Sequence, residues 1–531
     1  MIGQSRLSIT VLMVAYLSGC VMLPPGSGYP KIASLALAYP EQTKLGRQFE
    51  KTAREHNGNS GFRIISAGNE GFLVRMQMIN AAIRTLDLQY YIFRGDETGR
   101  LLTEAMIKAA DRGVRVRLLV DDGNTVAGDD QINEIKSHRG IEIRIFNPFA
   151  YRGHSKVIRG AEFMLSANRL DYRMHNKVLV VDNIIALIGG RNVGDQYFQI
   201  DPESQFSDGD VFAAGPIAQR ISGTFDQFWN SELTIPSEAL VGKKPPTTDL
   251  NEHRVELQEE YRNLKAEGVD YVGKIASGEP FRGMITGRLP LIWAPAQLVY
   301  DTPEKKRVIN GAITGELMTS AVINATKAVR TELLMVSPYL IPGDEGMHIF
   351  KVLRQRNVKV RILTNSLESS TVLLAQSGYM KYRVPLLESG VDLYEIRSLL
   401  GNNRGSGQTK AISSYGNYSL HAKFFVFDRK QVFIGSMNLD QRSMNINTEI
   451  GLIIDSLVLA EQIAKRFDAM VQPANAYRLA LRPNAAGNST NLIWHTQENA
   501  KAVEYTTEPA RSDWQRNKVK MLTLLPLDSE L

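Results

Sequence analysis

The chain carries the same order of apolar and polar segments twice. In its first half, the apolar runs LDLQYYI and VRVRLLV are separated by LLTEAMIKAADRG, which has apolar residues at helical spacing and ends at Gly113. In its second half, ELLMVS and VKVRILT follow in the same order, 244 to 246 residues later. Alternating strands and helices favour parallel strands in a layered fold. We therefore predict the α/β class, with two repeats packed face to face.

With 531 residues, the chain is too long for one ordinary hydrophobic core. The linker expected between the repeats contains the charged stretch NEHRVELQEEYRNLKAEG, which predicts a solvated helix. The expected segments are a lipoprotein-type signal peptide (1–20), a tether and edge helix (21–60), the first repeat (61–250), the linker (251–290), the second repeat (291–475) and a C-terminal tail packing on the core (476–531).

The N-terminus has the layout of a secretory signal peptide. Arg6 precedes a short apolar run, and the small residues Ser18 and Gly19 precede Cys20, the single cysteine. The ending LSGC resembles the lipobox of bacterial lipoproteins, which implies lipid attachment at Cys20. Acyl chains on this residue would hold the protein stably on a membrane. We therefore expect a membrane-anchored lipoprotein of the bacterial envelope that faces the periplasm, with the outer membrane slightly favoured.

Composition adds little to this interpretation. Hydrophobic residues make up 43% and charged residues 22% of the chain, which is typical of a globular protein and not of a disordered one. The formal net charge is +6. This mild excess suits a phosphate-bearing or membrane-surface partner, but it also fits many proteins that have neither.

The pattern H-x-K-x4-D occurs in both repeats, as MHNKVLVVD and LHAKFFVFD. Side chains two residues apart on a strand share a face, so each histidine lies beside its lysine. The aspartates are five residues beyond the lysines, and this odd number directs them to the opposite face. The motifs therefore predict His175, Lys177, His421 and Lys423 as catalytic residues, and Asp182 and Asp428 as structural ones.

Each motif continues in the same way. Seven residues after the aspartate comes GGRN or GSMN, which adds Asn192 or Asn438 as a neutral hydrogen-bond donor. Two such half-sites suit the chemistry of a phosphodiester. Lysines and amides would bind the anionic oxygens, one histidine would attack phosphorus, and the other would protonate the leaving alcohol.

A third H-x-K, at His154, lacks the rest of the pattern. Position 161 is alanine, and no glycine–asparagine element follows at the right distance. We interpret His154 as a surface histidine without a catalytic role.

The segments MHNKVLVVDNIIALIGGRN and LHAKFFVFDRKQVFIGSMN resemble the paired HKD motifs of the phospholipase D superfamily. This resemblance implies two α/β repeats around one composite site, a covalent phosphohistidine, and no metal or other cofactor. It assigns the nucleophilic attack to His175. His421 would act as general acid, and then as base for the incoming alcohol.

A nucleophilic histidine needs its far ring nitrogen held, and the family uses a downstream carboxylate for this purpose. Glu449 follows His421 by 28 residues, and Asp210 follows His175 by 35. We therefore expect each repeat to supply the carboxylate for its own histidine. Asp208 is the alternative partner of His175.

Other segments, among them FNPF, FDQFWNS, GSMNLDQRS and NTEIGL, resemble the bacterial cardiolipin synthases of the C type over about residues 60–531. That resemblance implies phosphatidyl transfer between membrane phospholipids. The donor would be phosphatidylethanolamine, phosphatidylglycerol or both, and the product would be cardiolipin.

Three other functions stay open. A phospholipase D would resolve the same intermediate with water, and only exclusion of water from the site distinguishes it from a transferase. A nucleic-acid phosphodiesterase would need a strongly basic groove with stacking aromatics. We interpret the aromatic residues in QYYIF and QYFQ as core packing instead, and expect no nucleic-acid partner. A lipid-binding lipoprotein without activity would have little reason to keep two intact motifs.

Overall fold

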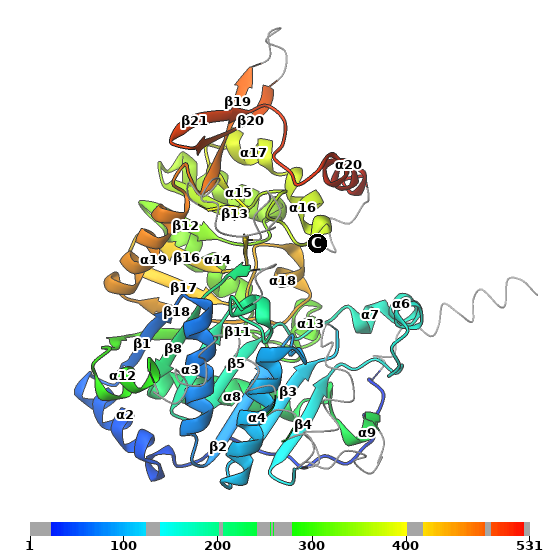
Figure 1. The fold of residues 1–531 in the computed structure, drawn as a ribbon, viewed down its shortest axis with the longest axis vertical. Coiled ribbons are helices and arrows are strands. Elements are labelled where there is room, and N and C mark those ends of the chain that lie inside the picture. Colours follow the sequence, from blue (N-terminus) through cyan, green and yellow to red (C-terminus); the bar gives the residue numbers. More distant parts are fainter. Residues whose placement is uncertain are drawn as a thin grey trace, which may run out of the picture.

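The computed structural model describes residues 23–123, 138–200, 205–241, 279–400, 418–483 and 490–524, together with residues 255 and 259. Cys20 and most of the linker predicted to be a helix lie outside these ranges. The described chain forms two mixed sheets with helices on their faces, one sheet for each half of the sequence (Figure 1).

The first sheet has nine strands in the order β10-β1-β8-β6-β5-β2-β3-β4-β9. Strands β2, β3 and β4 are parallel to one another, and the remaining neighbours are antiparallel. The strands are β1 (Ser60–Ile65), β2 (Thr85–Tyr90), β3 (Arg115–Asp121), β4 (Ile141–Phe146), β5 (Lys177–Val181), β6 (Ile185–Gly189), β8 (Asp210–Ala214), β9 (Thr234–Pro236) and β10 (Ile292–Ala294).

The second sheet has ten strands in the order β11-β18-β17-β16-β12-β13-β14-β19-β20-β21. The strands are β11 (Ala296–Tyr300), β12 (Glu332–Val336), β13 (Lys359–Asn365), β14 (Asp392–Ile396), β16 (Phe424–Phe427), β17 (Gln431–Gly435), β18 (Ile450–Asp455), β19 (Ala476–Pro483), β20 (Thr490–Glu498) and β21 (Lys501–Tyr505).

The two sheets repeat one topology. The run β1-β8-β6-β5-β2-β3-β4 of the first sheet matches β11-β18-β17-β16-β12-β13-β14 of the second. This confirms the two α/β repeats. The expectation of parallel strands holds only for β2, β3 and β4 and for β12, β13 and β14, because each histidine motif continues into an antiparallel hairpin, β5–β6 or β16–β17.

The motif aspartates close these hairpins. Asp182 and Asp428 both have a positive φ, at 50° and 52°, where the chain turns back. The Asp182 carboxylate accepts hydrogen bonds from the backbone N–H groups of residues 83–85, and Asp428 accepts the same bonds from residues 330–332. These contacts fit the predicted structural role, since each carboxylate binds the start of the strand that pairs with its own motif strand, β2 for Asp182 and β12 for Asp428.

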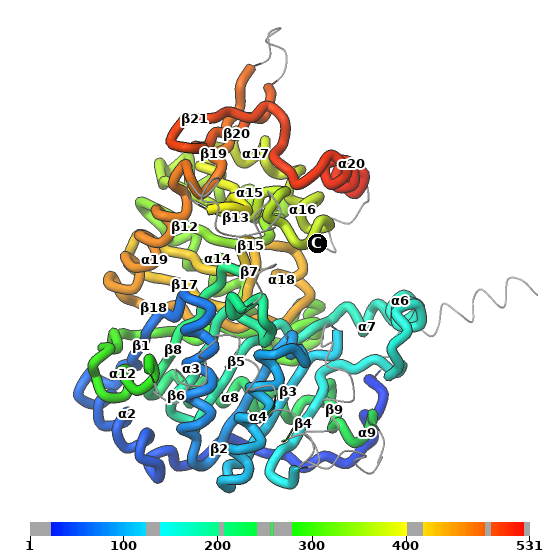
Figure 2. Tube along the Cα trace, viewed as in Figure 1, coloured from blue at the N-terminus to red at the C-terminus, as the bar shows by residue number. Residues whose placement is uncertain are grey.

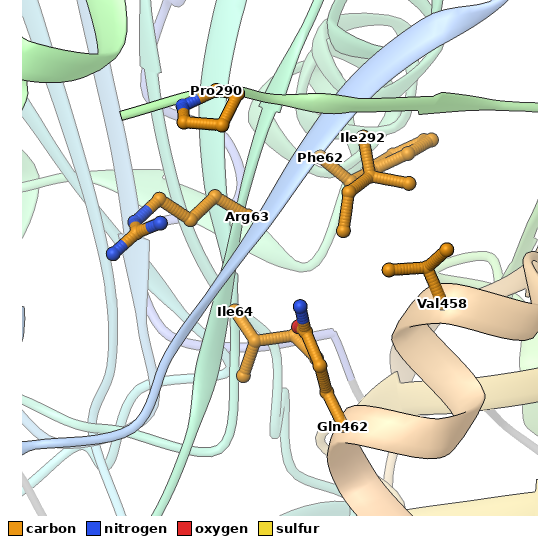
Figure 3. A pocket seen from close by; sticks show the side chains of 7 residues that line it. All are labelled: Phe62, Arg63, Ile64, Pro290, Ile292, Val458 and Gln462. Carbon is orange, nitrogen blue, oxygen red and sulfur yellow. The ribbon is translucent and has the colours of Figure 1, made fainter. Parts of the chain in front are cut away.

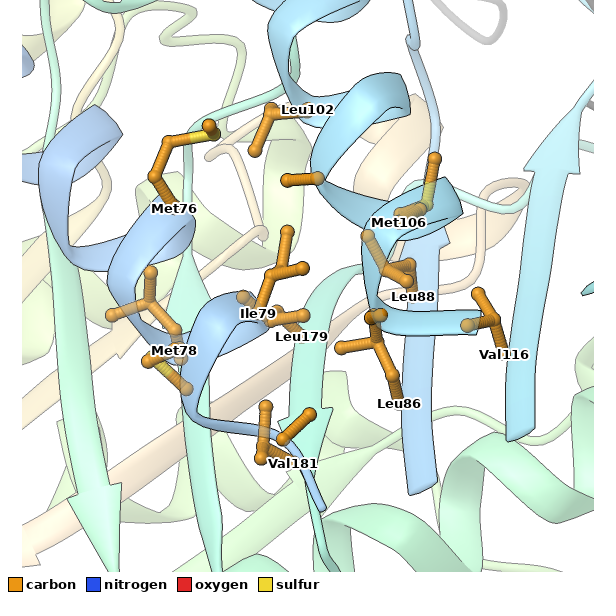
Figure 4. Packing of buried hydrophobic residues seen from close by; sticks show 14 of the residues in the cluster. Met76, Met78, Ile79, Leu86, Leu88, Leu102, Met106, Val116, Leu179 and Val181 are labelled. Carbon is orange, nitrogen blue, oxygen red and sulfur yellow. The ribbon is translucent and has the colours of Figure 1, made fainter. Parts of the chain in front are cut away.

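Helices cover the outer face of each sheet. In the first repeat, α3 (Gly68–Ala81) and α4 (Glu97–Asp111) pack on β2, β3 and β5 through Met76, Ile79 and Leu102 (Figure 4). In the second repeat, α14 (Met318–Ala328), α15 (Gly343–Gln355) and α17 (Arg383–Glu388) cover the corresponding face.

A third apolar cluster joins the repeats. Strand β17 lies against β6 and β8, and helices α8 (Pro216–Asn230) and α19 (Leu457–Met470) fill the space to either side. The facing residues include Val178, Val180, Ile188 and Val211 of the first sheet and Val426, Ile434 and Leu452 of the second. The repeats therefore share one continuous core between their sheets.

One expected segment boundary differs in the structure. The second repeat does not begin at residue 291, because β10 pairs with β1 in the first sheet and the chain crosses over at Pro295. Part of the expected tether is bound to the first repeat. Ser34 and Ala36 donate backbone hydrogen bonds to side chains of α8, and α2 (Lys44–Glu55) follows.

The described part of the C-terminal tail packs on the second repeat. Strand β19 extends the second sheet beyond β14, and α20 (Asp513–Leu522) lies against α16 (Leu373–Met380). In the described part of the chain, we find no helix that combines the length and apolar character needed to cross a membrane.

Candidate active site

The first half-site is built around His175, just before β5. Its backbone N–H donates to the carbonyl of Thr448 in the second repeat, at 2.9 Å. Its Nδ1 lies 2.9 Å from Oε2 of Glu449, the next residue along. Glu449 also accepts a hydrogen bond from the Ser436 hydroxyl. Because Nδ1 faces this carboxylate, Nε2 is the nitrogen left for chemistry.

The second half-site is built in the same way around His421, just before β16. Its backbone N–H donates to the carbonyl of Ser207 in the first repeat, at 2.7 Å, and its Nδ1 lies 2.5 Å from Oδ2 of Asp208. Short parallel strands β7 (Gln205–Ser207) and β15 (Tyr418–Leu420) bring these segments together.

The carboxylates are therefore exchanged between the repeats. Glu449 holds His175 and Asp208 holds His421, so the prediction that each repeat supplies its own carboxylate is wrong. Strand pairing explains the exchange, because each histidine segment pairs with the carboxylate segment of the other repeat. Each imidazole therefore receives its carboxylate partner from the opposite half of the chain.

Asp210 does not contact a histidine. Its Oδ2 lies 2.8 Å from NH1 of Arg75 and 3.0 Å from NH1 of Arg191, and all three side chains are buried. The predicted partnership of Asp210 with His175 is therefore wrong, and so is the alternative with Asp208. Strand register makes the reason clear: Asp210 faces Gly189 as Gly451 faces Gly435, so two residues earlier Asp208 corresponds to Glu449.

Both motif lysines lie inside the site. Lys177 and Lys423 are buried, and each Nζ donates to the carbonyl oxygen of its own motif histidine, at 2.5 Å. Lys423 Nζ is also 3.2 Å from His421 Nε2. Burial lowers the pKa of Lys423 to about 8, although Asp208 and Glu449 oppose this, and burial lowers the pKa of Lys177 well below its usual value.

The imidazoles favour the neutral form. Burial and then Lys423 lower the pKa of His421 to about 3. Burial, Lys177 and Lys423 lower the pKa of His175 well below its usual value, which places lysines from both repeats near this ring. A neutral imidazole with Nδ1 facing a carboxylate keeps the Nε2 lone pair available for attack on phosphorus.

The two predicted amides differ in their surroundings. Asn192 donates one N–H to the Tyr197 hydroxyl, at 3.0 Å, and its Oδ1 accepts from the backbone of Ile92. Asn438 is buried, and its Oδ1 has no hydrogen-bond partner among the described residues. Asn192 therefore positions an aromatic residue of the site, whereas Asn438 keeps an acceptor unused.

Aromatic rings frame both histidines, which the sequence interpretation missed. Tyr91 stands edge-on to His175, with 4.8 Å between ring centroids. Tyr197 stands edge-on to His421, and Phe206 stacks on it, each with centroids 5.3 Å apart. The interpretation of QYYIF and QYFQ as core packing is therefore wrong for Tyr91 and Tyr197. Tyr197 follows Asn192 of the motif by five residues, and this position could have suggested its place in the site.

His154 lies outside the site. Its side chain is exposed, as expected for a surface histidine. A cavity of about 460 Å³ also lies elsewhere, between β1, β10 and α19, and its lining includes Phe62, Ile292 and Val458 (Figure 3). No histidine or lysine lines this cavity, so it offers no phosphodiester chemistry. Among the described residues, no group of three or more His, Cys, Asp and Glu side chains is arranged to hold a metal ion.

The comparisons with known proteins agree with this geometry. The family described as "Cardiolipin synthase, PLD-like domain" matches residues 76–229 and 321–471, one copy in each repeat. The chain therefore belongs to the phospholipase D superfamily, among the proteins with cardiolipin synthase domains.

Individual relatives extend over nearly the whole chain. Cardiolipin synthase C of Escherichia coli (strain K12) is 35% identical over 474 residues, which is 89% of this chain and 97% of that protein. An uncharacterized protein of Helicobacter pylori is 27% identical over 528 residues, covering 98% of this chain and 99% of its own length.

A solved structure shares the fold. The phosphatidylserine synthase of Haemophilus influenzae Rd KW20 covers 91% of this chain and 100% of its own, with a TM-score of 0.53 and 12% identity. At this identity the likeness concerns the arrangement of sheets and helices alone.

Proposed function

We propose that this phosphatidyltransferase makes cardiolipin, through a phosphatidyl group held covalently on an active-site histidine. The observation that carries the proposal is the pair of imidazole–carboxylate contacts, each formed by both repeats at one place. Cardiolipin synthase C of E. coli, related over almost its whole length, supports the choice of product.

In the first half-reaction, Nε2 of His175 attacks the phosphorus of a phospholipid donor. The bond from phosphorus to the head-group oxygen breaks. At this step His421 must be in its protonated form, which the negative charge of the bound phosphodiester favours, and its Nε2 gives a proton to the departing alcohol. Glu449 stabilises the positive charge that develops on His175. Lys177 and Lys423 bind the non-bridging oxygens, where negative charge accumulates in the transition state.

In the second half-reaction, a free hydroxyl of phosphatidylglycerol attacks the same phosphorus. His421, now neutral, accepts the proton of this hydroxyl while the phosphorus–nitrogen bond to His175 breaks. The product is cardiolipin, and both imidazoles return to their starting state. Phosphatidylethanolamine, phosphatidylglycerol or both serve as donors.

The two histidine–carboxylate pairs differ in proton affinity. Burial raises the pKa of Glu449 to about 7, so this pair retains a proton near neutral pH. Burial also opposes ionisation of Asp208, but His421 and Lys423 outweigh it and lower its pKa. This difference favours a second assignment, in which His421 attacks and His175 donates the proton.

Trapping the covalent intermediate distinguishes these assignments. With phosphorus-labelled donor lipid, His421→Ala should accumulate labelled protein, because attack by His175 remains while the second half-reaction is slow. His175→Ala should stay unlabelled. The reverse pattern would establish His421 as the nucleophile.

Product analysis tests the proposed activity itself. Full-length protein in vesicles of phosphatidylethanolamine and phosphatidylglycerol should produce cardiolipin, and this activity should persist in excess chelator. Phosphatidic acid as the only product would instead establish a hydrolase. No turnover by wild-type protein, with lipid binding retained, would establish a binding protein.

The proposal includes membrane attachment through Cys20. The LSGC ending supports lipid addition at this residue, and this would place the enzyme on its substrates in the periplasm of a bacterial envelope. Wild-type protein should remain with the membrane fraction and should incorporate labelled fatty acid. Cys20→Ser should lose the label; retention of label by this variant would contradict attachment at Cys20.

A further inference from the structure

Helix α6 (Lys156–Leu165) exposes its apolar side chains to solvent. Val157, Met164 and Leu165 are 81%, 82% and 88% exposed, and Ile158 is 48% exposed. At 100° per residue, these four side chains lie on one side of the helix, together with the exposed Ala161. A surface helix normally directs such a stripe towards the core.

The opposite, polar side attaches α6 to the protein. Glu162 accepts hydrogen bonds from the backbone N–H groups of Ala150 and Tyr151. Arg159 donates to the carbonyl of Asp122, at 2.7 Å, and lies over the Phe149 ring. These contacts fix the orientation of the helix, so the apolar stripe is held outward by the fold.

Exposed basic residues lie at the start of α6 and on a helix that contacts the short helix following α6. Lys156 is exposed at the start of the helix, and Lys306 and Arg307 are exposed on α13 (Lys305–Ile309). Helix α13 is adjacent because Lys306 Nζ donates to the carbonyl of Asn168, which is in the short helix α7 (Ala167–Leu170) that follows α6. An outward apolar stripe beside exposed cations has the chemistry of an interfacial membrane helix.

The position of α6 relates it to the active site. The helix lies in the connection between β4 and β5, so it precedes the His175 motif in the chain. Helices α6 and α7 project beyond the rest of the first repeat (Figure 2). Arg442 of the second repeat binds Asp171 at the end of α7, at 2.7 Å, which ties this projection to both halves of the site.

We propose that α6 inserts its apolar stripe into the surface of an anionic phospholipid bilayer. The four apolar side chains enter the boundary between headgroups and acyl chains, while Lys156, Lys306 and Arg307 contact anionic headgroups. The proposal rests on the proposed function, since it gives the enzyme a way to meet its phospholipid substrate. It adds a contact with the membrane that is separate from Cys20.

Fluorescence at single sites tests the insertion directly. The experiment uses full-length protein carrying Cys20→Ser, with a polarity-sensitive dye attached at Met164→Cys. The control carries the dye at Leu457→Cys instead, because Leu457 is 66% exposed and lies on α19. With vesicles of phosphatidylethanolamine and phosphatidylglycerol, emission should shift to the blue at position 164 and stay unchanged at 457. No shift at 164 would overturn the proposal. A shift that depends on protein concentration without vesicles would instead indicate a second copy of the chain.

Activity measurements separate this inference from the proposed function. Leu165→Glu should lower kcat/KM on vesicles by about tenfold, because it replaces one inserted apolar side chain with a charge. The same variant should act normally on a short-chain phospholipid dissolved as monomers, and Leu457→Glu should act normally on both. If the wild type is active and Leu165→Glu equals it on vesicles, the inference fails. If the wild type produces no transfer or hydrolysis product, the proposed function fails.

Discussion

At the scale of residues, the site depends on the two carboxylates that cross between the repeats. His175 meets Glu449, and His421 meets Asp208, in surroundings where every member of both pairs is buried. Buried charges are stable only when they are paired and hydrogen-bonded. Lys177 and Lys423 lie among these groups, so positive and negative charges are paired within the site before a phosphodiester binds.

Asp208 and Asp210 should respond differently to the same change. Asp208→Asn should lower kcat by about a thousandfold, because the His421 ring loses the charge that orients it. Asp210→Asn leaves Arg75 and Arg191 buried without an anion, so it should lower the free energy of unfolding by about 3 kcal/mol. Steady-state kinetics and denaturant unfolding of both variants check this. Equal effects of the two variants on stability and kcat would contradict the assignment.

Glu449 should make the stability of the protein fall with rising pH. Burial raises its pKa from 4.5 to about 7 in the folded protein. Between these values the folded state holds a proton that the unfolded state has lost, so this contribution is complete at low pH and disappears as the pH rises through about 7. The free energy of unfolding of wild type should fall by about 2 kcal/mol more than that of Glu449→Gln when the pH rises from 5 to 8. Denaturant unfolding at both pH values measures this, and an unchanged difference would contradict the shifted pKa.

The sequence indicated the candidate catalytic side chains and carboxylates, but not which carboxylate contacts which histidine. His175, Lys177, His421 and Lys423 could be recognised because each is defined by neighbours within one strand. The partner of each histidine lies in the other repeat, and distance along the chain carries no information about such a contact. Asp208 and Glu449 are equivalent because each lies two residues before the residue that pairs with the last glycine of its hairpin, Gly189 or Gly435. This equivalence becomes visible only when the strand register is known.

At the scale of elements, the segment between β7 and β8 joins the two repeats. Gly209 lies between the catalytic partner Asp208 and the structural Asp210. A Cβ added at Gly209 would lie 2.0 Å from Cζ of Phe424, which is buried in the core between the sheets. The glycine therefore allows the first repeat to approach β16 of the second.

Gly209→Ala should weaken the packing between the two repeats. The added methyl group should lower the free energy of unfolding by about 1–3 kcal/mol, because Phe424 must shift within a packed core. It should also lower kcat, since the shift displaces Asp208. Gly223→Ala in α8 is the matched control. Nothing lies within 4 Å of its Cβ, so it should be neutral or slightly stabilising. Wild-type stability and kcat in Gly209→Ala would show that the close approach is not needed.

Strand and helix patterns predicted most of these elements, and their exceptions have physical reasons. The repeated runs identified β2, β3, β12 and β13, because these short and mostly apolar runs recur in the same order in both halves of the chain. The antiparallel hairpins β5–β6 and β16–β17 are equally apolar, so their direction was not visible. The boundary expected at residue 291 placed β10 in the second repeat, because β10 and β11 are neighbours in the chain and only the crossing at Pro295 separates them.

At the scale of the whole molecule, the chain is one catalytic unit made from two similar halves. The shared core between the sheets brings the histidine segments together, and each half completes the imidazole of the other. The internal repeat of the sequence predicted two similar repeats packed face to face, and the family resemblance implied one composite site. It could not predict the outward stripe of α6, which became evident only when its polar side was found bound to the protein.

The most direct test of this account is the turnover of His175→Ala and His421→Ala with phospholipid vesicles. If the two histidines act on one phosphorus atom, each single substitution should lower kcat by at least about a thousandfold, and the double substitution should lower it little further. If each repeat instead held an independent site, each single variant would retain about half of the wild-type rate. That second result would contradict a single site shared by the two repeats.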